Sequence, residues 1–344
     1  MKTATIYSIA SAVGVSPSTV SRAFSRPEMV KVEVRERILE TARELGYAPN
    51  RAARGLATGR TGVIGMLVPD VENPFFPPLI RAVQVAARDN DADLLLIDSE
   101  LSVSAEQELV DRIRPQVDGL IIASPRLSST KLATVLAGIP SVIVNRPVRS
   151  LPTVVCDNTA ALQEIADHLH QLGHRRIALL RGPREAWASS YRAEAVRSWA
   201  EGKNVELVEL GPFEAQFEDG RAAVSGIVDS GATAVFAFDD LMAAGVVASL
   251  SERGEVVPTH RSIVGCDDVL LAQTMTPSLT TVAAPFEAMG RTAVELLGEL
   301  LAGRPASSIT LPGSAMVRGS IGPPAVPHDT PGTASIIGPT DTTC

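Results

Sequence analysis

The sequence predicts an α/β protein with a small helical head at the N-terminus and a two-lobed core of parallel sheets flanked by helices. The head is predicted by residues 5–22, where apolar residues at helical spacing are interrupted by Gly14. The core is predicted by the stretch after residue 62, where short apolar runs alternate with helical segments in two successive series. Two series of similar size predict two lobes with a cleft between them.

The first stretch has the pattern of a helix-turn-helix. Residues 6–13 place apolar side chains on one helical face, and Gly14 can end that helix because glycine accepts a positive φ. Ser16 is a good N-cap for a second helix, and Pro17 suits the first helical position, where its missing N–H goes unused. The second helix of such a motif is the kind that enters the major groove of DNA. An ordinary helical hairpin on the surface is the alternative.

A third helix, a hinge and a linker complete the N-terminal region. Residues 32–45 have apolar side chains at helical spacing, and Gly46 ends the pattern, so we assign residues 1–49 to the head. Asn50 can cap a short hinge helix, and residues 50–61 form the hinge helix and linker. There Arg51 and Arg54 would contact phosphates and Leu56 would insert into the minor groove, unless Leu56 only packs within the linker.

The core is assigned to residues 62–322. The expected strands are 63–68, 94–98, 120–123, 142–145, 154–157, 177–180, 205–210, 234–238 and 263–266. The expected helices are 78–88, 105–113, 131–136, 159–172, 190–201, 219–229, 240–253 and 287–301. The N-lobe takes about 62–158 and 284–310, and the C-lobe takes about 159–283 and 311–322. Residues 323–344 are rich in Pro, Gly, Thr and Ser and are expected to form a disordered tail.

Composition narrows the function classes. Residues 1–61 carry a net charge of +5 and the remainder −13, so only the head suits a polyanionic partner. No apolar run reaches the length of a membrane span, and no signal peptide pattern is present, so we expect a cytoplasmic protein without a membrane role. Three scattered cysteines give no disulfide framework. His168, His170 and His174 do not share one face, so no metal site and no cofactor are expected.

These pieces resemble the lactose-repressor/galactose-repressor (LacI/GalR) family of bacterial transcription regulators, over residues 4 to about 322. The quotable matches are Thr5-Ile-Tyr7, Gly14-Val-Ser16, Thr19-Val-Ser-Arg22, Glu44-Leu-Gly-Tyr-Ala-Pro-Asn50, Thr58-Gly-Arg-Thr-Gly62, Asn73-Pro-Phe-Phe76, Leu172-Gly-His-Arg-Arg-Ile177, Val264-Gly-Cys-Asp-Asp268 and Pro277-Ser-Leu-Thr-Thr-Val282. The resemblance implies a repressor that binds a near-palindromic operator as a homodimer. It also implies that a small metabolite bound between the core lobes controls operator affinity.

The candidate DNA-binding residues lie mainly on the second helix. Arg22 is the expected base reader, because an arginine can donate two hydrogen bonds to the N7 and O6 atoms of guanine; a phosphate contact is the alternative. Pro17 and Ser18 occupy the positions that vary in the family's readout. The remaining candidates in the head are expected to contact phosphates and fix the register. They are Tyr7, Ser16, Thr19 and Ser21.

The candidate effector-binding residues fall at the carboxyl ends of the predicted strands or just after them, where open α/β sheets bind ligands. By resemblance, Arg192 and Asp267 are the strongest contacts. The full set is Asn73, Phe75, Asn145, Arg146, Trp187, Arg192, Phe217, Asp239 and Asp267. A sugar or sugar derivative is the expected effector, and a purine, on which Phe75 and Phe217 could stack, is the alternative. For any one aromatic residue, packing in the core is an equal possibility.

Two other classes of protein are alternatives to a regulator. A solute-binding transport protein would share the two-lobed core but would have a signal peptide and no basic head. A sugar-processing enzyme would need a paired acid and base, for which Asp239-Asp240 and Asp267-Asp268 are the candidates. The nucleotide-binding and hydrolase motifs GxGxxG, GxxxxGK[ST] and GxSxG are missing where they would be needed, so we expect no enzyme. Residues 323–344 contain no leucine, which favours a dimer over the family's leucine-heptad tetramers.

Overall fold

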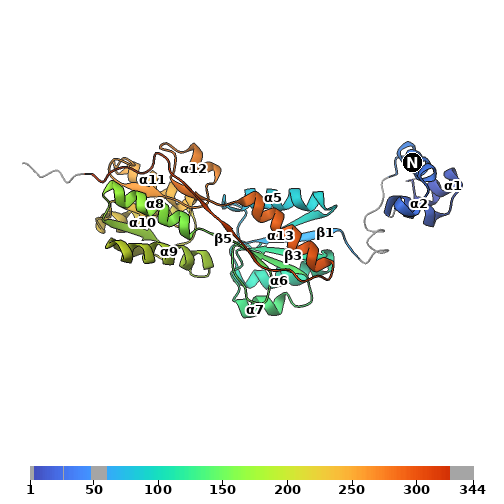
Figure 1. Ribbon diagram of the computed structural model, residues 1–344, viewed down its shortest axis with the longest axis horizontal. Coiled ribbons are helices and arrows are strands. Elements are labelled where there is room, and N and C mark those ends of the chain that lie inside the picture. The colour runs from blue at the N-terminus through green and yellow to red at the C-terminus, as the bar shows by residue number, and fades with distance from the viewer. Residues whose placement is uncertain (1–3, 26, 48–59, 326–344) are drawn as a thin grey trace, which may run out of the picture.

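The computed structural model describes residues 4–25, 27–47 and 60–325 (Figure 1). The predictions for Asn50, Arg51, Arg54 and Leu56, and for the tail from residue 326 onward, lie outside these ranges. Within them, no helix combines the length and the apolar character that crossing a membrane would require.

The head contains the predicted helix-turn-helix. Its helices are α1 (Ile6–Val13), α2 (Pro17–Ser25) and α3 (Val32–Glu44), with a 3₁₀ turn η1 (Pro27–Met29) between the last two. A capping box between Thr5 and Ser8 starts α1, and Gly14 ends it at a φ of 76°. A small core holds the helices together, with Ile9, Val20 and Ile38 fully buried. These contacts confirm the predicted helix-turn-helix.

The N-lobe is a six-stranded parallel sheet with helices on both faces. Its strand order is β11-β5-β4-β3-β1-β2. The strands are β1 (Val63–Val68), β2 (Asp93–Asp98), β3 (Gly119–Ala123), β4 (Ser141–Val144), β5 (Thr153–Asp157) and β11 (Ile309–Pro312). Alternate residues of β1 enter different cores. Met66 packs with α5 (Phe76–Asp89) and α13 (Phe286–Leu301), whereas Leu67 packs with α6 (Val103–Ile113) and α7 (Ser129–Val135).

The C-lobe repeats this plan with a four-stranded parallel sheet in the order β7-β6-β8-β9. Its strands are β6 (Arg176–Leu180), β7 (Glu206–Leu210), β8 (Ala234–Phe236) and β9 (Ser262–Val264). One face is covered by α8 (Thr159–Leu172) and α9 (Trp187–Lys203), the other by α10 (Phe217–Asp229) and α11 (Asp240–Glu252). The two lobes are joined side by side (Figure 1). Both sheets therefore confirm the predicted fold class.

The chain passes between the lobes three times, and the three passages lie side by side. They follow β5, β10 (Thr281–Ala283) and β11, and the last leads into β12 (Ser314–Met316), which pairs antiparallel with β10. The third passage falls at Gly313, just after β11 and close to the boundary expected at about residue 310. A Cβ atom at Gly313 would lie 2.7 Å from Oδ1 of Asn158 and 3.4 Å from the carbonyl oxygen of Ala283. Gly313 thus allows the three passages to pack against one another.

Three predicted strands end earlier than expected, and the difference bears on the site. The sequence predicted strands to Asn145, Phe238 and Cys266, whereas the strands end at Val144, Phe236 and Val264. Asn145 adopts a φ of 62°, in the left-handed region, so it turns the chain instead of continuing the ladder. The short elements β10, β11, β12 and α12 (Leu270–Thr274) were not predicted.

We predict that Gly313→Ala lowers the free energy of unfolding by about 1–3 kcal/mol, because the new methyl group would overlap the fixed side chain of Asn158. Gly298→Ala is the matched control. A Cβ atom at that exposed position of α13 meets nothing within 4 Å, so this change should stabilise the chain by about 0.5–1 kcal/mol. Urea unfolding of both variants tests the prediction, and equal stabilities would contradict the packed crossing.

Candidate functional site

One cavity lies where residues of both lobes meet at the carboxyl ends of the strands. It encloses about 620 Å³ of space, part of which is open to solvent. Its walls are Pro69, Phe75, Phe76, Leu101, Ser124, Pro125, Arg126, Asn145 and Arg146 from the N-lobe, and Ala186, Trp187, Ala188, Arg192, Phe238, Asp239 and Asp267 from the C-lobe. Parallel sheets place the loops that follow their strands on one edge, so segments distant in sequence meet here.

A buried ion pair forms the inner part of the C-lobe wall. Nη2 of Arg192, on α9, donates to Oδ1 of Asp267 at 2.6 Å, and Nη1 donates to the carbonyl oxygen of Phe238, also at 2.6 Å. The two side chains are 8% and 6% exposed. Burial opposes the charge on Arg192, but the carboxylates of Asp267 and Asp239 outweigh it and raise the pKa of the guanidinium. Arg192 therefore stays charged in a nearly dry setting.

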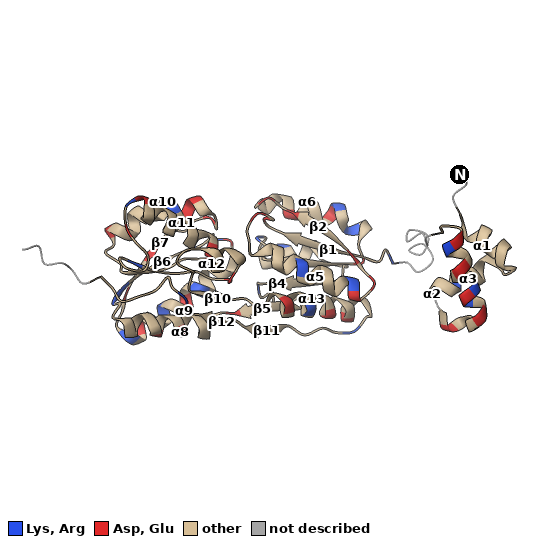
Figure 2. Cartoon of the chain, turned by 90° about the horizontal axis from the view of Figure 1, so that it is seen from above, with Lys and Arg blue, Asp and Glu red and all other residues tan. Residues whose placement is uncertain are grey.

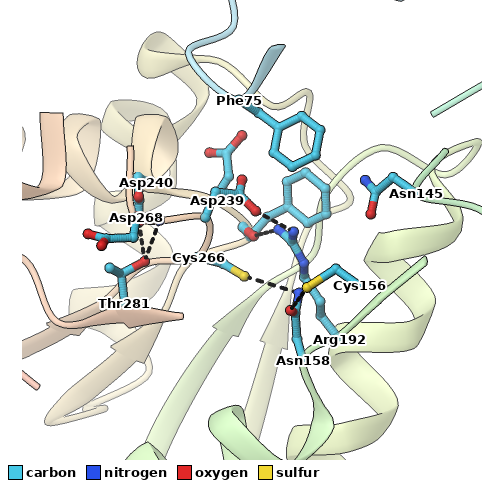
Figure 3. Close-up of polar contacts among 12 residues, drawn as sticks. Phe75, Asn145, Cys156, Asn158, Arg192, Asp239, Asp240, Cys266, Asp268 and Thr281 are labelled. Carbon is cyan, nitrogen blue, oxygen red and sulfur yellow. Dashed lines mark hydrogen bonds and ion pairs between the residues drawn. The ribbon is translucent and has the colours of Figure 1, made fainter. Parts of the chain in front are cut away.

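Asp239 lies beside this pair at the start of α11 (Figure 3). Its Oδ1 accepts from the backbone N–H of Met242 at 2.8 Å, and its Oδ2 accepts from the Asn73 amide at 3.2 Å. The same Asn73 amide donates to the carbonyl oxygen of Ala215 at 3.2 Å. Burial raises the pKa of the Asp239 carboxyl. Asn73 does not line the cavity itself, but it ties the N-lobe to two groups of the C-lobe.

The N-lobe wall is built from loops that follow β3 and β4. Ser124 and Asn145 both have a positive φ, and the Asn145 amide donates to the Ser124 hydroxyl at 3.0 Å. Nη1 of Arg146 donates to the carbonyl oxygens of Pro125 and Leu127, at 2.7 and 2.6 Å, and so holds the β3 loop in place. Asp267, on the opposite wall, has a φ of 116°. The left-handed backbone of Ser124, Asn145 and Asp267 is unfavourable in conformational energy, so the packing around these three wall residues must hold it in place.

Aromatic side chains complete the cavity. Phe75 contacts Phe76 and Phe286 edge to face, with ring centroids 5.1 and 5.2 Å apart. Trp187 stacks on Tyr191 at 4.3 Å, and the Tyr191 hydroxyl donates to Asp157 at 2.7 Å.

Phe217 is the exception among the predicted aromatic residues. It is half-buried at the start of α10 and is not part of the described cavity wall. Its carbonyl oxygen lies where a Cβ atom of Gly245, on α11, would be, so this residue serves the close contact between the two helices. Phe217 therefore does not share this cavity wall with Phe75, and the stacking of a purine on these two residues stays a prediction.

Sequence reasoning missed several wall residues. The Phe238 ring lies under the Arg192 guanidinium, 5.0 Å from ring centroid to the guanidinium carbon, which is a cation–π contact. Arg126 forms an ion pair of 3.1 Å with Glu214 of the other lobe. Arg126 follows a predicted strand, so the strand-end rule could have included it. Phe238 was instead predicted as the last residue of a strand, because it continues an apolar run.

In each of the two acid pairs considered for an enzyme, the structure places one aspartate in the cavity wall and the other outside it. Asp239 and Asp267 line the cavity, whereas Asp240 and Asp268 lie behind them and have their own partners. Asp240 accepts from the Thr281 hydroxyl at 2.6 Å (Figure 3). It also accepts from the Val269 N–H at 3.0 Å, and Asp268 pairs with Arg318 at 2.6 Å. Burial raises the pKa of Asp240 to about 6. Among the described residues, no cluster of three or more metal-ligating side chains occurs.

The second candidate site is the outer face of α2 in the head. Arg22, Ser18 and Ser21 are exposed there, Pro17 begins the helix, and Tyr7 of α1 is 71% exposed. The Ser16 hydroxyl caps α2 by accepting from the N–H of Thr19 at 3.1 Å. Arg22 is the single charged residue of α2, whereas acidic and basic residues alternate along α3 (Figure 2). The face of α2 therefore offers hydroxyls and a cation with no acid to repel a phosphate.

Comparisons with known proteins agree with both parts of the structure. Residues 5–50 match the model of the bacterial regulatory proteins of the lacI family, and residues 166–321 match the periplasmic binding protein-like domain. The HTH-type transcriptional repressor CytR of Escherichia coli strain K12 is 32% identical over 311 residues, covering 88% of this chain and 91% of CytR. The ribose operon repressor of Halalkalibacterium halodurans is 30% identical, covering 85% and 89%.

Solved structures extend the similarity over most of this chain. The lac repressor dimer bound to operator and the anti-inducer ONPF has a TM-score of 0.83 at 25% identity, covering 93% of this chain and all of that one. A regulator from Enterococcus faecium with bound ribose has a TM-score of 0.68 at 28% identity, covering 76% and 99%. Similarity that includes both the head and the two-lobed core shows that this chain belongs to the lacI family of bacterial regulatory proteins.

Proposed function

We propose that this chain is a sequence-specific DNA-binding transcriptional repressor whose operator affinity is controlled by a small metabolite, a sugar or sugar derivative, bound between the core lobes. The observation that carries the proposal is one cavity walled by both lobes, with Arg192, Asp239 and Asp267 facing Phe75 and Asn145. The same chain exposes the face of α2 on its head. We expect regulation rather than catalysis.

The chemistry of the cavity favours a hydroxylated ligand. A carboxylate accepts hydrogen bonds from hydroxyl groups, and an arginine donates several in one plane. The buried Nε of Arg192 has no hydrogen-bond partner among the described residues, so one further donor is available. The aromatic rings can cover the apolar face of a sugar. Relatives support this class, because one solved regulator holds ribose and another, CelR, holds cellobiose.

The coupling to DNA follows from the two-lobed design. A ligand that contacts both walls stabilises one angle of closure between the lobes, and the three adjacent passages at Gly313 form the hinge. That angle would set the separation of the two hinge segments in a dimer, and so the fit of both heads to the operator. The coupling is reciprocal, because operator DNA must change ligand affinity by the same factor.

We propose a homodimer, in which the groove between α5 and α13 contributes to the interface. Ala82, Val85 and Phe286 form its apolar floor, and Arg81, Asp89, Glu287, Arg291 and Glu295 surround it. A mixed set of charges around an apolar strip suits a two-fold interface, in which each patch contacts its own copy.

The effector site can be tested by an operator-release assay. DNA selected by the protein from a random pool would be titrated with the parent chain in the presence of candidate sugars. A sugar that changes operator affinity should bind the parent chain in calorimetry, and Arg192→Met should lose that binding. Arg197→Met is the matched control, because its guanidinium lies on the same helix but pairs with surface glutamates. Equal sugar affinity in both variants would place the effector site elsewhere.

The base-reading role of Arg22 can be tested on the same DNA. Arg22→Ala should cost on the order of 1–3 kcal/mol per half-site on selected DNA and much less on random DNA, because it removes a bidentate base contact. The exposed Arg43 of α3 provides the control variant, Arg43→Ala. Equal losses on specific and random DNA would show that Arg22 contacts only phosphate.

The proposed oligomeric state predicts a dimer mass in light scattering at micromolar concentration. Val85→Glu should shift the mass toward the monomer and weaken operator binding, because it places a charge in the apolar strip of the groove. Gln84→Glu adds the same charge at the neighbouring exposed position and should leave the dimer intact. A tetramer mass for the parent chain, or a dimer in Val85→Glu, would contradict this arrangement.

A further inference from the structure

Three arginines line the cavity, and two of them form ion pairs within the protein. Arg126 is paired with Glu214 at 3.1 Å, and Arg192 is paired with Asp267 at 2.6 Å. Arg146 uses its guanidinium to hold the β3 loop, and the charge of the buried Glu106 acts on it. The cavity therefore has no surplus positive charge with which to attract an anionic ligand.

Asp239 is the carboxylate of the cavity wall that forms no ion pair with these arginines. It lines the cavity and is only 3% exposed, yet both of its oxygens accept from neutral groups, the Met242 N–H and the Asn73 amide. Among the ion pairs formed within the described ranges, none includes Asp239. The charge of Arg192 acts on Asp239 from a distance, but the larger effect is burial, which is unfavourable for a carboxylate without an ion pair and raises the pKa of Asp239.

The capping of α11 does not explain why residue 239 is a charged aspartate. A neutral asparagine caps a helix about as well as an aspartate does, so the Met242 contact needs an oxygen acceptor but no carboxylate. The walls around Asp239 also suit a cation. Phe238 already holds the Arg192 guanidinium on its face, and the rings of Phe75 and Trp187 line the same cavity.

We propose that the effector carries a protonated amine on a hydroxylated framework, as in an amino sugar, and that Asp239 binds this amine. The proposal rests on the proposed effector function, because it places the amine in the same cavity. The ammonium group would supply the missing positive charge at Asp239, while Arg192 and Asp267 bind hydroxyl groups. Asp239 would then select amines over neutral sugars of the same shape.

Matched ligands test this selection on the full-length parent chain. Calorimetry would compare D-glucosamine, D-galactosamine and D-mannosamine with the corresponding hexoses, which have nearly the same shape without the charge. Their N-acetyl derivatives would be compared as well, because they keep the nitrogen but lose the charge and gain an acetyl group. At least one amine should bind roughly tenfold or more tightly than both of its neutral counterparts, since hydrogen bonds to charged groups are worth about 1.5–3 kcal/mol. A neutral member that binds as tightly as its amine, or no bound amine at millimolar concentration, would overturn the proposal.

Two variants separate this inference from the function on which it rests. Asp239→Asn keeps the helix cap and should abolish the tighter binding of the amine relative to its neutral counterparts. Asp229→Asn, at the exposed far end of α10, should retain that difference in affinity. An undiminished advantage in Asp239→Asn would overturn the role of Asp239. A neutral sugar that binds the parent chain as tightly as its amine, but does not bind Arg192→Met, would support the effector cavity and contradict only the preference for an amine.

Discussion

The ion pair between Arg192 and Asp267 is the interaction on which the rest of the site depends. It joins the first turns of α9 to the segment after β9, and through the Phe238 carbonyl it also fixes the segment after β8. Burying such charges is costly unless every partner is in place. The surrounding loops must therefore adopt one arrangement, including the left-handed backbone at Asp267. The positions of Phe238 and Asp239 in the cavity wall follow from this constraint.

A second constraint acts where the chain passes between the lobes. Asn158 lies in the first passage, where its side chain accepts from the Cys156 thiol at 2.9 Å and donates to Cys266 at 3.5 Å (Figure 3). Burial raises the pKa of Cys156 to about 12, so its thiol remains protonated and can donate. The ends of β5 and β9 are thus connected across the hinge through one carboxamide. The packing at Gly313 adds the third passage to the same point.

Most of the fold could be predicted from sequence because its strands are short, fully buried apolar runs. β1 was predicted at its actual bounds, and the other strands predicted in the two lobes lie within two residues of theirs. The rule that ligands bind at the strand ends also selected Asn145, Asp239 and Asp267 correctly as cavity residues. Strands of three or four residues, such as β10 and β12, have too few alternations to give a periodic signal.

What sequence could not supply was the direction of individual side chains and the partners they find across the lobes. Phe217 and Phe238 both stand beside strand ends or helix starts, yet only Phe238 lines the cavity. The difference arises from a helix contact at Gly245, which depends on tertiary packing. The pairing of Arg126 with Glu214 spans 88 positions of sequence and both lobes, so no local pattern contains it.

The contacts of Asn73 have a consequence for the speed of the response. Asn73 joins the lobes through Ala215 and Asp239, and Arg126 joins them through Glu214. A small molecule that passes these contacts must wait for them to open, and its escape must wait for the same event. If the contacts re-form around the bound molecule, they slow entry and exit by one common factor and leave the equilibrium unchanged. Asn73 and Arg126 would then set how long the effector stays bound after its concentration in the surroundings has fallen.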